Sequence, residues 1–281
     1  MATASMKYPE RAVKTVLAEL NDLEDRISGS YPIFPESTLN HKYNKYNAIT
    51  DILDAPGIAY FGIGINGFYN TGDRIQGTPY QPKSNEMDLY QPIPFRCVPI
   101  EEDLSTAERL NYRMRVQQTF GGQQYWCYYL KVLNQIDNSV SIVRIDPTTG
   151  MEQPYEINPA NLTPKPSETN VSGVTSGAIT EVMVTKRVRA ALSGAEVYEA
   201  INVIYEGDLT MALVSEWGLY TGVDRTVDGY DAAGVSFRYT EAIYAQLAYK
   251  LCNIGSVVNA ASWDGNRIFT FGNGKLIHQA L

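Results

Sequence analysis

The first clear pattern of hydrophobic and polar positions covers residues 9–27, where apolar residues return every three or four positions. Such spacing is typical of a helix with one buried face. Pro9 suits a first helical turn, and Ser28 with Gly29 supplies a stop. Because the apolar stripe follows nearly a heptad spacing, it predicts either pairing with a second copy or docking on the chain's own core. The stripe, our first candidate interface, consists of Val13, Val16, Leu17, Leu20, Leu23 and Ile27.

Two turn-rich stretches follow, one from residue 30 to 56 and one from residue 66 to 94. Pro32 and Pro35 interrupt any regular element in the first stretch, and further prolines do so in the second. Irregular stretches of this length usually carry function or bind a neighbour, so we expect extended arms. Tyrosine offers an apolar ring and a hydrogen-bonding tip, which suits protein interfaces and also stacking on sugars. The tyrosines of the first arm, Tyr31, Tyr43 and Tyr46, are therefore further candidate contact residues.

Apolar runs between turn residues predict the elements of the next part of the chain. We expect a strand over residues 57–65 and a helix over residues 101–115 that begins with a capping box of Ser105 and Glu108. The aromatic run QQYWCYYLKVL is typical of a strand with both faces covered. We expect it to pair with SVSIVRI through a turn at Asp137 and Asn138.

The carboxyl-terminal part shows a similar alternation of elements. We expect a strand over residues 178–188, then a short helix capped by Ser193, then a buried strand over residues 209–219 and a loop across Asp228 and Gly229. A helix should begin near Thr240, because apolar residues recur at a helical spacing after it. These residues are Ile243, Leu247, Leu251 and Ile254. The final predicted element is a hairpin with its turn at Asn273 and Gly274.

This order of elements predicts an α+β fold that is rich in strands, with antiparallel sheets, a few packed helices, an amino-terminal helix and long extended arms. A run of Pro, Ser, Thr and Asn over residues 154–177 reads as a linker or long loop. We therefore expect four parts: the helix and arm over residues 1–56, a strand-rich half over 57–153, the linker over 154–177, and an α+β half over 178–281.

Composition and charge exclude several classes of protein. Hydrophobic residues make up 44% of the 281 residues and charged residues 19%, which is typical of a globular chain. The net charge of −8 repels phosphate backbones, so we expect no specific nucleic-acid partner. The amino terminus lacks the layout of a signal peptide and no apolar run reaches membrane-spanning length, so we expect no membrane contact. The chain should stay in the cytosol or in a particle assembled there.

The cysteines and the glycine motif of this chain are explained more simply by structural roles than by a catalytic or binding site. Cys97, Cys127 and Cys252 lie far apart without metal-site spacing, so buried thiols are expected rather than a disulfide or a metal site. Gly62, Gly64 and Gly67 spell GxGxxG, but the glycines and the proline that follow forbid the helix a dinucleotide site requires. We therefore expect these glycines to lie in a twisted or bulged strand.

The acidic and histidine residues also form no recognisable constellation. Glu101, Glu102 and Asp103 fit the first turns of a helix, where its dipole favours negative charge. His41 and His278 are the only histidines, and neither lies near a nucleophile motif. We therefore expect no catalytic residue, no cofactor and no metal, and hence a protein that works by binding alone.

Three stretches of the chain resemble a known family. They are IYEGDLTMALVSEWGLYTGVDR over residues 204–225, YTEAIYAQLAYK over residues 239–250 and FRCVPIEEDLSTAERLNYRMR over residues 95–115. Together they resemble tailed-bacteriophage virion structural proteins. The resemblance implies a structural subunit of a tail, baseplate or head-to-tail neck, assembled in the host cytoplasm and carried in the virion. Its partners would be copies of itself and other phage structural proteins.

Two alternatives remain open from the sequence. The excess of tyrosine, 20 residues in all, favours a carbohydrate- or receptor-binding virion module. A carboxylate-dependent hydrolase using Glu101 or Asp103 is the third hypothesis, for which the sequence supplies no second carboxylate at a useful spacing.

Overall fold

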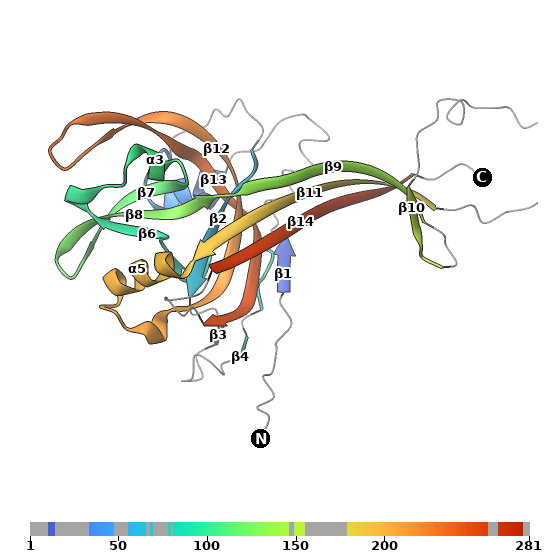
Figure 1. Ribbon diagram of the computed structural model, residues 1–281, viewed down its shortest axis with the longest axis horizontal. Coiled ribbons are helices and arrows are strands. Elements are labelled where there is room, and N and C mark those ends of the chain that lie inside the picture. Colours follow the sequence, from blue (N-terminus) through green and yellow to red (C-terminus); the bar gives the residue numbers. More distant parts are fainter. Residues whose placement is uncertain are drawn as a thin grey trace, which may run out of the picture. The chain divides into compact units, whose positions relative to one another are not determined.

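The structure is a computed structural model, and its described part falls into two compact units (Figure 1). The first unit combines Met1–Leu133 with Ala191–Gly265, and the second combines Asn134–Ala190 with Asn266–Leu281. Each unit therefore joins two separate stretches of sequence, whereas the pattern had indicated consecutive halves. The described residues are 11–14, 34–47, 56–65, 68–69, 78–79, 81–145, 149–154, 179–257 and 264–277.

The first unit is built on an eight-stranded sheet with the order β1-β13-β12-β2-β8-β6, to which β5 adds beside β2 and β7 beside β8. Every pairing in it is antiparallel. Its strands are β1 (Arg11–Lys14), β2 (Gly57–Ile65), β5 (Pro92–Ile93), β6 (Arg96–Pro99), β7 (Tyr112–Phe120), β8 (Gln123–Val132), β12 (Leu213–Tyr230) and β13 (Ser236–Val257). A separate pair consists of β3 (Phe68–Tyr69) and β4 (Thr78–Pro79).

The second unit contains a four-stranded sheet with the order β10-β9-β11-β14. Its strands are β9 (Asn134–Ile145), β10 (Glu152–Pro154), β11 (Ile179–Ser193) and β14 (Asp264–Ile277). The hairpin expected between β8 and residues 139–145 is wrong, because β9 runs straight through Asp137 and Asn138 and pairs with β10 and β11. The hairpin expected at Asn273 and Gly274 is also wrong, since β14 continues through both residues.

The coarse class and several local predictions are confirmed. The fold is strand-rich with antiparallel sheets and few helices, and β2 has the predicted bounds. Short α3 (Thr106–Arg109) begins at the Ser105 and Glu108 capping box, and α5 (Gly194–Ile204) begins with the same arrangement at Ser193. Both are local hydrogen-bond motifs that depend on residues three apart in sequence.

The helix expected from Thr240 is wrong, because this segment belongs to β13 and pairs with β12. All eight residues of Glu241–Ala248 are buried, so both faces of the strand are covered. A strand covered on both faces loses its alternation of apolar and polar residues, and its apolar positions can then match a helical period. The strand expected over 209–219 begins later, at Leu213 after the short η3 (Leu209–Met211), and extends through the expected loop at Asp228 and Gly229.

Two amino-terminal expectations are covered only in part by the described residues. Arg11–Lys14, inside the predicted helix, form β1 at the edge of the sheet, where Val13 pairs with Lys250. The first arm contains η1 (Pro35–Ser37) and α2 (Leu39–Lys42), which contact β13 through hydrogen bonds such as Asn40 Nδ2 to the Ala242 carbonyl at 2.8 Å. The other candidate interface residues of this region, Val16, Leu17, Leu20, Leu23, Ile27 and Tyr31, lie outside the described residues.

The helix predicted over residues 101–115 is much shorter than expected. After η2 (Ile100–Glu102) and α3, the chain enters β7 at Tyr112. Glu241 of β13 accepts hydrogen bonds from the backbone amides of Met114 and Arg115, and β8 pairs with the rest of β7. These long-range contacts replace the helical hydrogen bonds that the local pattern favoured. Most of the linker predicted over 154–177 lies outside the described residues.

Candidate functional site

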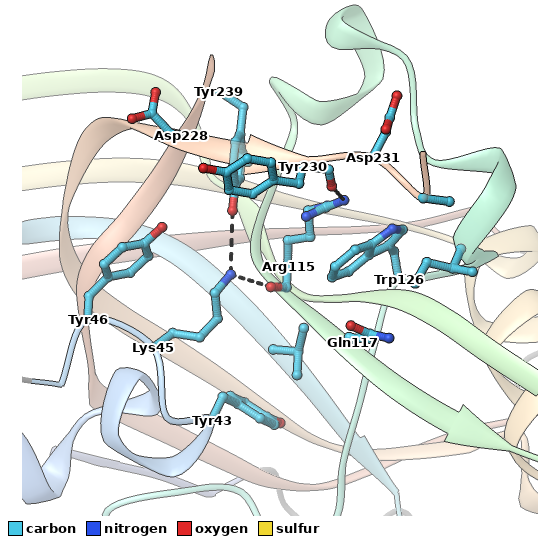
Figure 2. A pocket seen from close by; sticks show the side chains of 14 residues that line it. Tyr43, Lys45, Tyr46, Arg115, Gln117, Trp126, Asp228, Tyr230, Asp231 and Tyr239 are labelled. Carbon is cyan, nitrogen blue, oxygen red and sulfur yellow. Dashed lines mark hydrogen bonds between the residues drawn. The ribbon is translucent and has the colours of Figure 1, made fainter. Parts of the chain in front are cut away.

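The best-defined candidate site is an open pocket of about 530 Å³ within the first unit (Figure 2). It lies between the segment Tyr43–Tyr46, strands β7 and β8, and the end of the β12–β13 hairpin. Aromatic side chains dominate its lining, and four charged side chains accompany them. The aromatic residues are Tyr43, Tyr46, Trp126, Tyr230 and Tyr239, and the charged residues are Lys45, Arg115, Asp228 and Asp231.

Arg115 forms one side of the pocket floor and is almost fully buried. Its Nη2 lies 2.7 Å from Asp103 Oδ2, and its guanidinium carbon lies 3.3 Å from the centre of the Trp126 ring. Nη2 also donates to the Tyr230 carbonyl at 3.2 Å. The charge of Arg115 is thus neutralised by Asp103, and the guanidinium fixes the Trp126 ring by stacking and the hairpin by a hydrogen bond.

Glu241 organises the other side of the floor. Its carboxylate accepts hydrogen bonds from the backbone amides of Met114 at 2.6 Å and Arg115 at 3.0 Å, and it lies 3.1 Å from Lys45 Nζ. Met114 has a φ of +57°, a backbone conformation that costs energy for a residue other than glycine. The hydrogen bond from its amide to the buried Glu241 helps to hold that conformation.

Tyr239 belongs to the same hydrogen-bonded group, because its hydroxyl lies 3.3 Å from Glu241 Oε2. Burial, followed by the nearby negative charge of Glu241, raises the pKa of Tyr239. The same two causes raise the pKa of Tyr46. Both hydroxyls therefore stay protonated at neutral pH and can donate hydrogen bonds.

The rim of the pocket is more exposed than the floor. Tyr230 is 60% exposed, and the Asp228 side chain has only a long contact of 3.6 Å with Arg238. Asp231 accepts a hydrogen bond from the Val235 amide, which closes the hairpin turn. The pocket thus offers exposed ring faces, carboxylates and hydroxyls, and its lining includes no serine, cysteine or histidine that could act as a nucleophile or imidazole base. This combination is suited to binding a ligand.

Two of the predicted contact residues are placed at this pocket. Tyr43 stacks on Tyr129 with ring centres 4.5 Å apart, and Tyr46 lies at the opposite end of the same short segment. The sequence pattern does not predict the other walls of the pocket, since it places Trp126 in a covered strand and Asp228 in a loop. The only available signal was the cluster of Asp228, Tyr230 and Asp231 around a glycine.

The acidic residues considered for hydrolysis are not arranged as a pair. Glu101 and Glu102 are exposed in η2. Asp103 is held by Arg109 at 3.0 Å and by Arg115, and Tyr128 donates a hydrogen bond to it at 2.5 Å. Its oxygens are therefore engaged in structural contacts.

The glycines of the GxGxxG pattern are explained by close packing. A Cβ atom at Gly62 would lie 3.1 Å from the Tyr220 ring, and one at Gly64 would lie 3.0 Å from Glu216 Oε2. Both residues lie in β2, as expected, and Gly67 lies outside the described residues. These contacts account for both glycines without a bound nucleotide.

The three cysteines are buried free thiols, as expected. Cys97 and Cys127 face each other on β6 and β8 with their sulfur atoms 2.9 Å apart. Hydrogen bonding to Cys127 and burial raise the pKa of Cys97, and burial beside Glu216 raises the pKa of Cys252 to about 12. Thiols with raised pKa values are poor nucleophiles at neutral pH.

The described part of the chain has neither a metal-binding cluster nor a membrane-spanning helix. Within it, no three or more histidine, cysteine, aspartate or glutamate side chains are grouped so as to hold a metal ion. None of the helices in the described ranges is both long enough and apolar enough to span a membrane.

Comparison with known proteins yields a family but no individual relative. No curated protein and no solved structure is detectably similar to the chain. One protein family does match, from residue 1 to residue 273. The chain therefore belongs to that family, which is described as a family of unknown function (DUF7208).

Proposed function

We propose that the chain is a structural subunit of a tailed-bacteriophage particle, working in a tail, baseplate or neck through contacts with copies of itself and with other phage structural proteins. The proposal assigns it no catalytic residue and no cofactor, and gives the virion as its final location after assembly in the host cytoplasm. The sheet of the second unit is the observation that carries the oligomeric part of this proposal.

That sheet is long and narrow. Strands β9, β11 and β14 contain 12, 15 and 14 residues (Figure 1). At about 3.3 Å per residue, they extend for about 40–50 Å, whereas a four-stranded sheet is only about 15 Å wide. The described residues of this unit include no helix that would form a second layer.

The register between β9 and β11 brings apolar residues together. Val140 pairs with Val184, and Ile142 pairs with Val182. Residues two apart in a strand share a face, so these four residues form one apolar row on the sheet. A sheet is stable when its apolar face packs against another element. A neighbouring subunit could supply that layer, which supports a role in a symmetric or mixed assembly.

A pair of substitutions tests the role of this apolar row. Ile142→Lys should reduce the mass of the assembled species in native mass spectrometry, because a charge in a covered interface is costly. Ser141→Lys, on the other face of the same strand, is the matched control and should leave assembly intact. Circular dichroism and tryptophan fluorescence would check that the first unit stays folded in both variants. Equal assembly of the two variants would remove the structural support for the proposal.

A second experiment tests the location. Antibodies against the chain, applied to purified phage particles whose genome encodes it, should label one fixed place in electron micrographs. If the chain is found in the lysate of infected cells but is absent from purified particles, the virion proposal is wrong.

A further inference from the structure

We propose that the pocket between the Tyr43–Tyr46 segment and the β12–β13 hairpin is a binding site for a saccharide without negative charge. This inference goes beyond the role as a structural subunit, because it assigns a small ligand to a particular cavity. It rests on the size, the charge distribution and the hydrogen-bonding groups of the pocket.

Size is the first argument. The pocket volume of about 530 Å³ falls within the range of about 300–1,000 Å³ that is typical of sites for small molecules. The pocket is open and lies at the surface of one unit, so an extended chain of sugar units could enter it without opening the fold. A single side chain protruding from a partner protein would fill only part of this volume and leave the rest to water.

The distribution of charge disfavours an anionic ligand. Arg115 and Lys45 are the cations of the lining, and both are already paired, Arg115 with Asp103 at 2.7 Å and Lys45 with Glu241 at 3.1 Å. The exposed carboxylates of Asp228 and Asp231 remain at the rim. A phosphate, sulfate or uronate group would therefore meet negative charge without a free cation to compensate it.

The hydrogen-bonding groups favour a sugar over a basic side chain. Gln117 is exposed and offers both a donor and an acceptor, as do the tyrosine hydroxyls, while the two rim aspartates accept. Lysine and arginine side chains carry donors only. Sugar hydroxyl groups donate and accept, so they can satisfy both kinds of group in this lining.

The aromatic rings provide the remaining contact surface. Figure 2 shows Tyr46 and Trp126 on either side of Tyr230, whose ring is 60% exposed. The C–H faces of a pyranose ring are apolar and pack well on such rings. Arg115 already holds Trp126 at 3.3 Å from its ring centre, and the Glu241 group holds Tyr239. Fixed rings lower the entropic cost of binding.

Saturation-transfer difference NMR with the full chain tests the inference. The probes are uncharged oligosaccharides of glucose, galactose, rhamnose and N-acetylglucosamine, an oligogalacturonate as the anionic probe, and oligolysine as the basic peptide. At least one uncharged probe should bind, and the oligogalacturonate should not. Tyr230→Ala should weaken that binding by about tenfold, or about 1.4 kcal/mol. The matched control is Tyr90→Ala, which removes a tyrosine that is 68% exposed and lies outside the pocket lining, and should leave binding unchanged.

Three results would overturn the inference: no uncharged probe binds, Tyr230→Ala binds as tightly as the original chain, or oligolysine alone binds and is lost in Tyr230→Ala. The last result would make the pocket a protein-contact site. Native mass spectrometry of Tyr230→Ala separates this test from that of the structural role, because the proposed assembly surface lies in the other unit and should be unaffected.

Discussion

At the scale of single residues, a buried ion cluster fixes an irregular segment to the main sheet. Lys250 Nζ lies 3.0 Å from Glu216 Oε1 and 2.8 Å from Glu86 Oε2, and the side chains of Lys250 and Glu216 are 3% and 0% exposed. The other oxygen of Glu216 accepts a hydrogen bond from the Tyr90 amide at 2.7 Å. Lys250 is therefore the cation shared by these two carboxylates, and removing it leaves the buried Glu216 without its compensating charge.

We expect Lys250→Met to lower the free energy of unfolding by about 3–5 kcal/mol, because Glu216 would stay buried without its cation. Urea denaturation followed by tryptophan fluorescence measures this loss. The matched control is Arg238→Met, which removes a cation from a pair whose side chains are both 73% exposed and should change stability by less than about 1 kcal/mol. Similar losses in the two variants would contradict the special role of the buried cluster.

The ionisation of Lys250 also leads us to predict how the free energy of unfolding changes at alkaline pH. Burial lowers the pKa of Lys250, but the charge of Glu216 and hydrogen bonds to Glu86 and Glu216 outweigh burial, so the pKa is raised. A raised pKa in the folded state stabilises fully below the unfolded pKa of about 10.4, and this stabilisation is lost as the pH rises through the folded pKa. Below about pH 10.4 the contribution of Lys250 should stay constant, and above that pH the original chain should thus lose stability more steeply than Lys250→Met. Parallel curves would assign the loss to other groups.

At the scale of elements, the sequence predicts the features that depend on residues close together in the chain. It does not predict the features that depend on contacts between residues far apart in the chain. The capping boxes at Ser105 and Ser193 were predictable from local chemistry. The long strand β13 was not predictable in this way, because both of its faces are covered and its apolar and polar residues therefore do not alternate. The same limit applies to the pocket. Tyr43 and Tyr46 were predicted as contact residues, but Arg115 and Tyr239 join them through hydrogen bonds of Lys45 and Glu241 between residues far apart in the chain.

Strand β12 offers a test of how closely its neighbours pack. A Cβ atom at Gly222 would lie 2.5 Å from the Tyr244 carbonyl oxygen and would also clash with the Tyr60 ring. Gly222→Ala should therefore destabilise the chain by about 1–3 kcal/mol, because strand and ring must move apart. Gly57→Ala is the control, since a Cβ atom added there, at the start of β2, would meet no other atom within 4 Å. Thermal unfolding of both variants would measure the difference, and equal melting temperatures would contradict this packing.

At the scale of the whole molecule, the two units differ in how much core they contain. The first unit buries large side chains such as Trp217, Tyr220 and Phe61 within its sheet. The second unit has long strands and no helix among its described residues. Local stability follows the density of buried apolar contacts, so the two units should open with different free energies.

Hydrogen exchange should reveal this difference and connect it to assembly. In the isolated chain, we expect the amides of β9 and β11 to exchange faster than those of β12 and β13, because the second unit has less core to resist local opening. In purified phage particles, β9 and β11 should become strongly protected, since a neighbouring subunit would then cover the apolar row that contains Val140 and Ile142. Mass spectrometry of peptides from both preparations measures the two rates, with β12 and β13 as the internal reference. Slow exchange of β9 and β11 in the isolated chain would mean that the second unit is stable without a neighbour, and the assembly role would lose its physical basis.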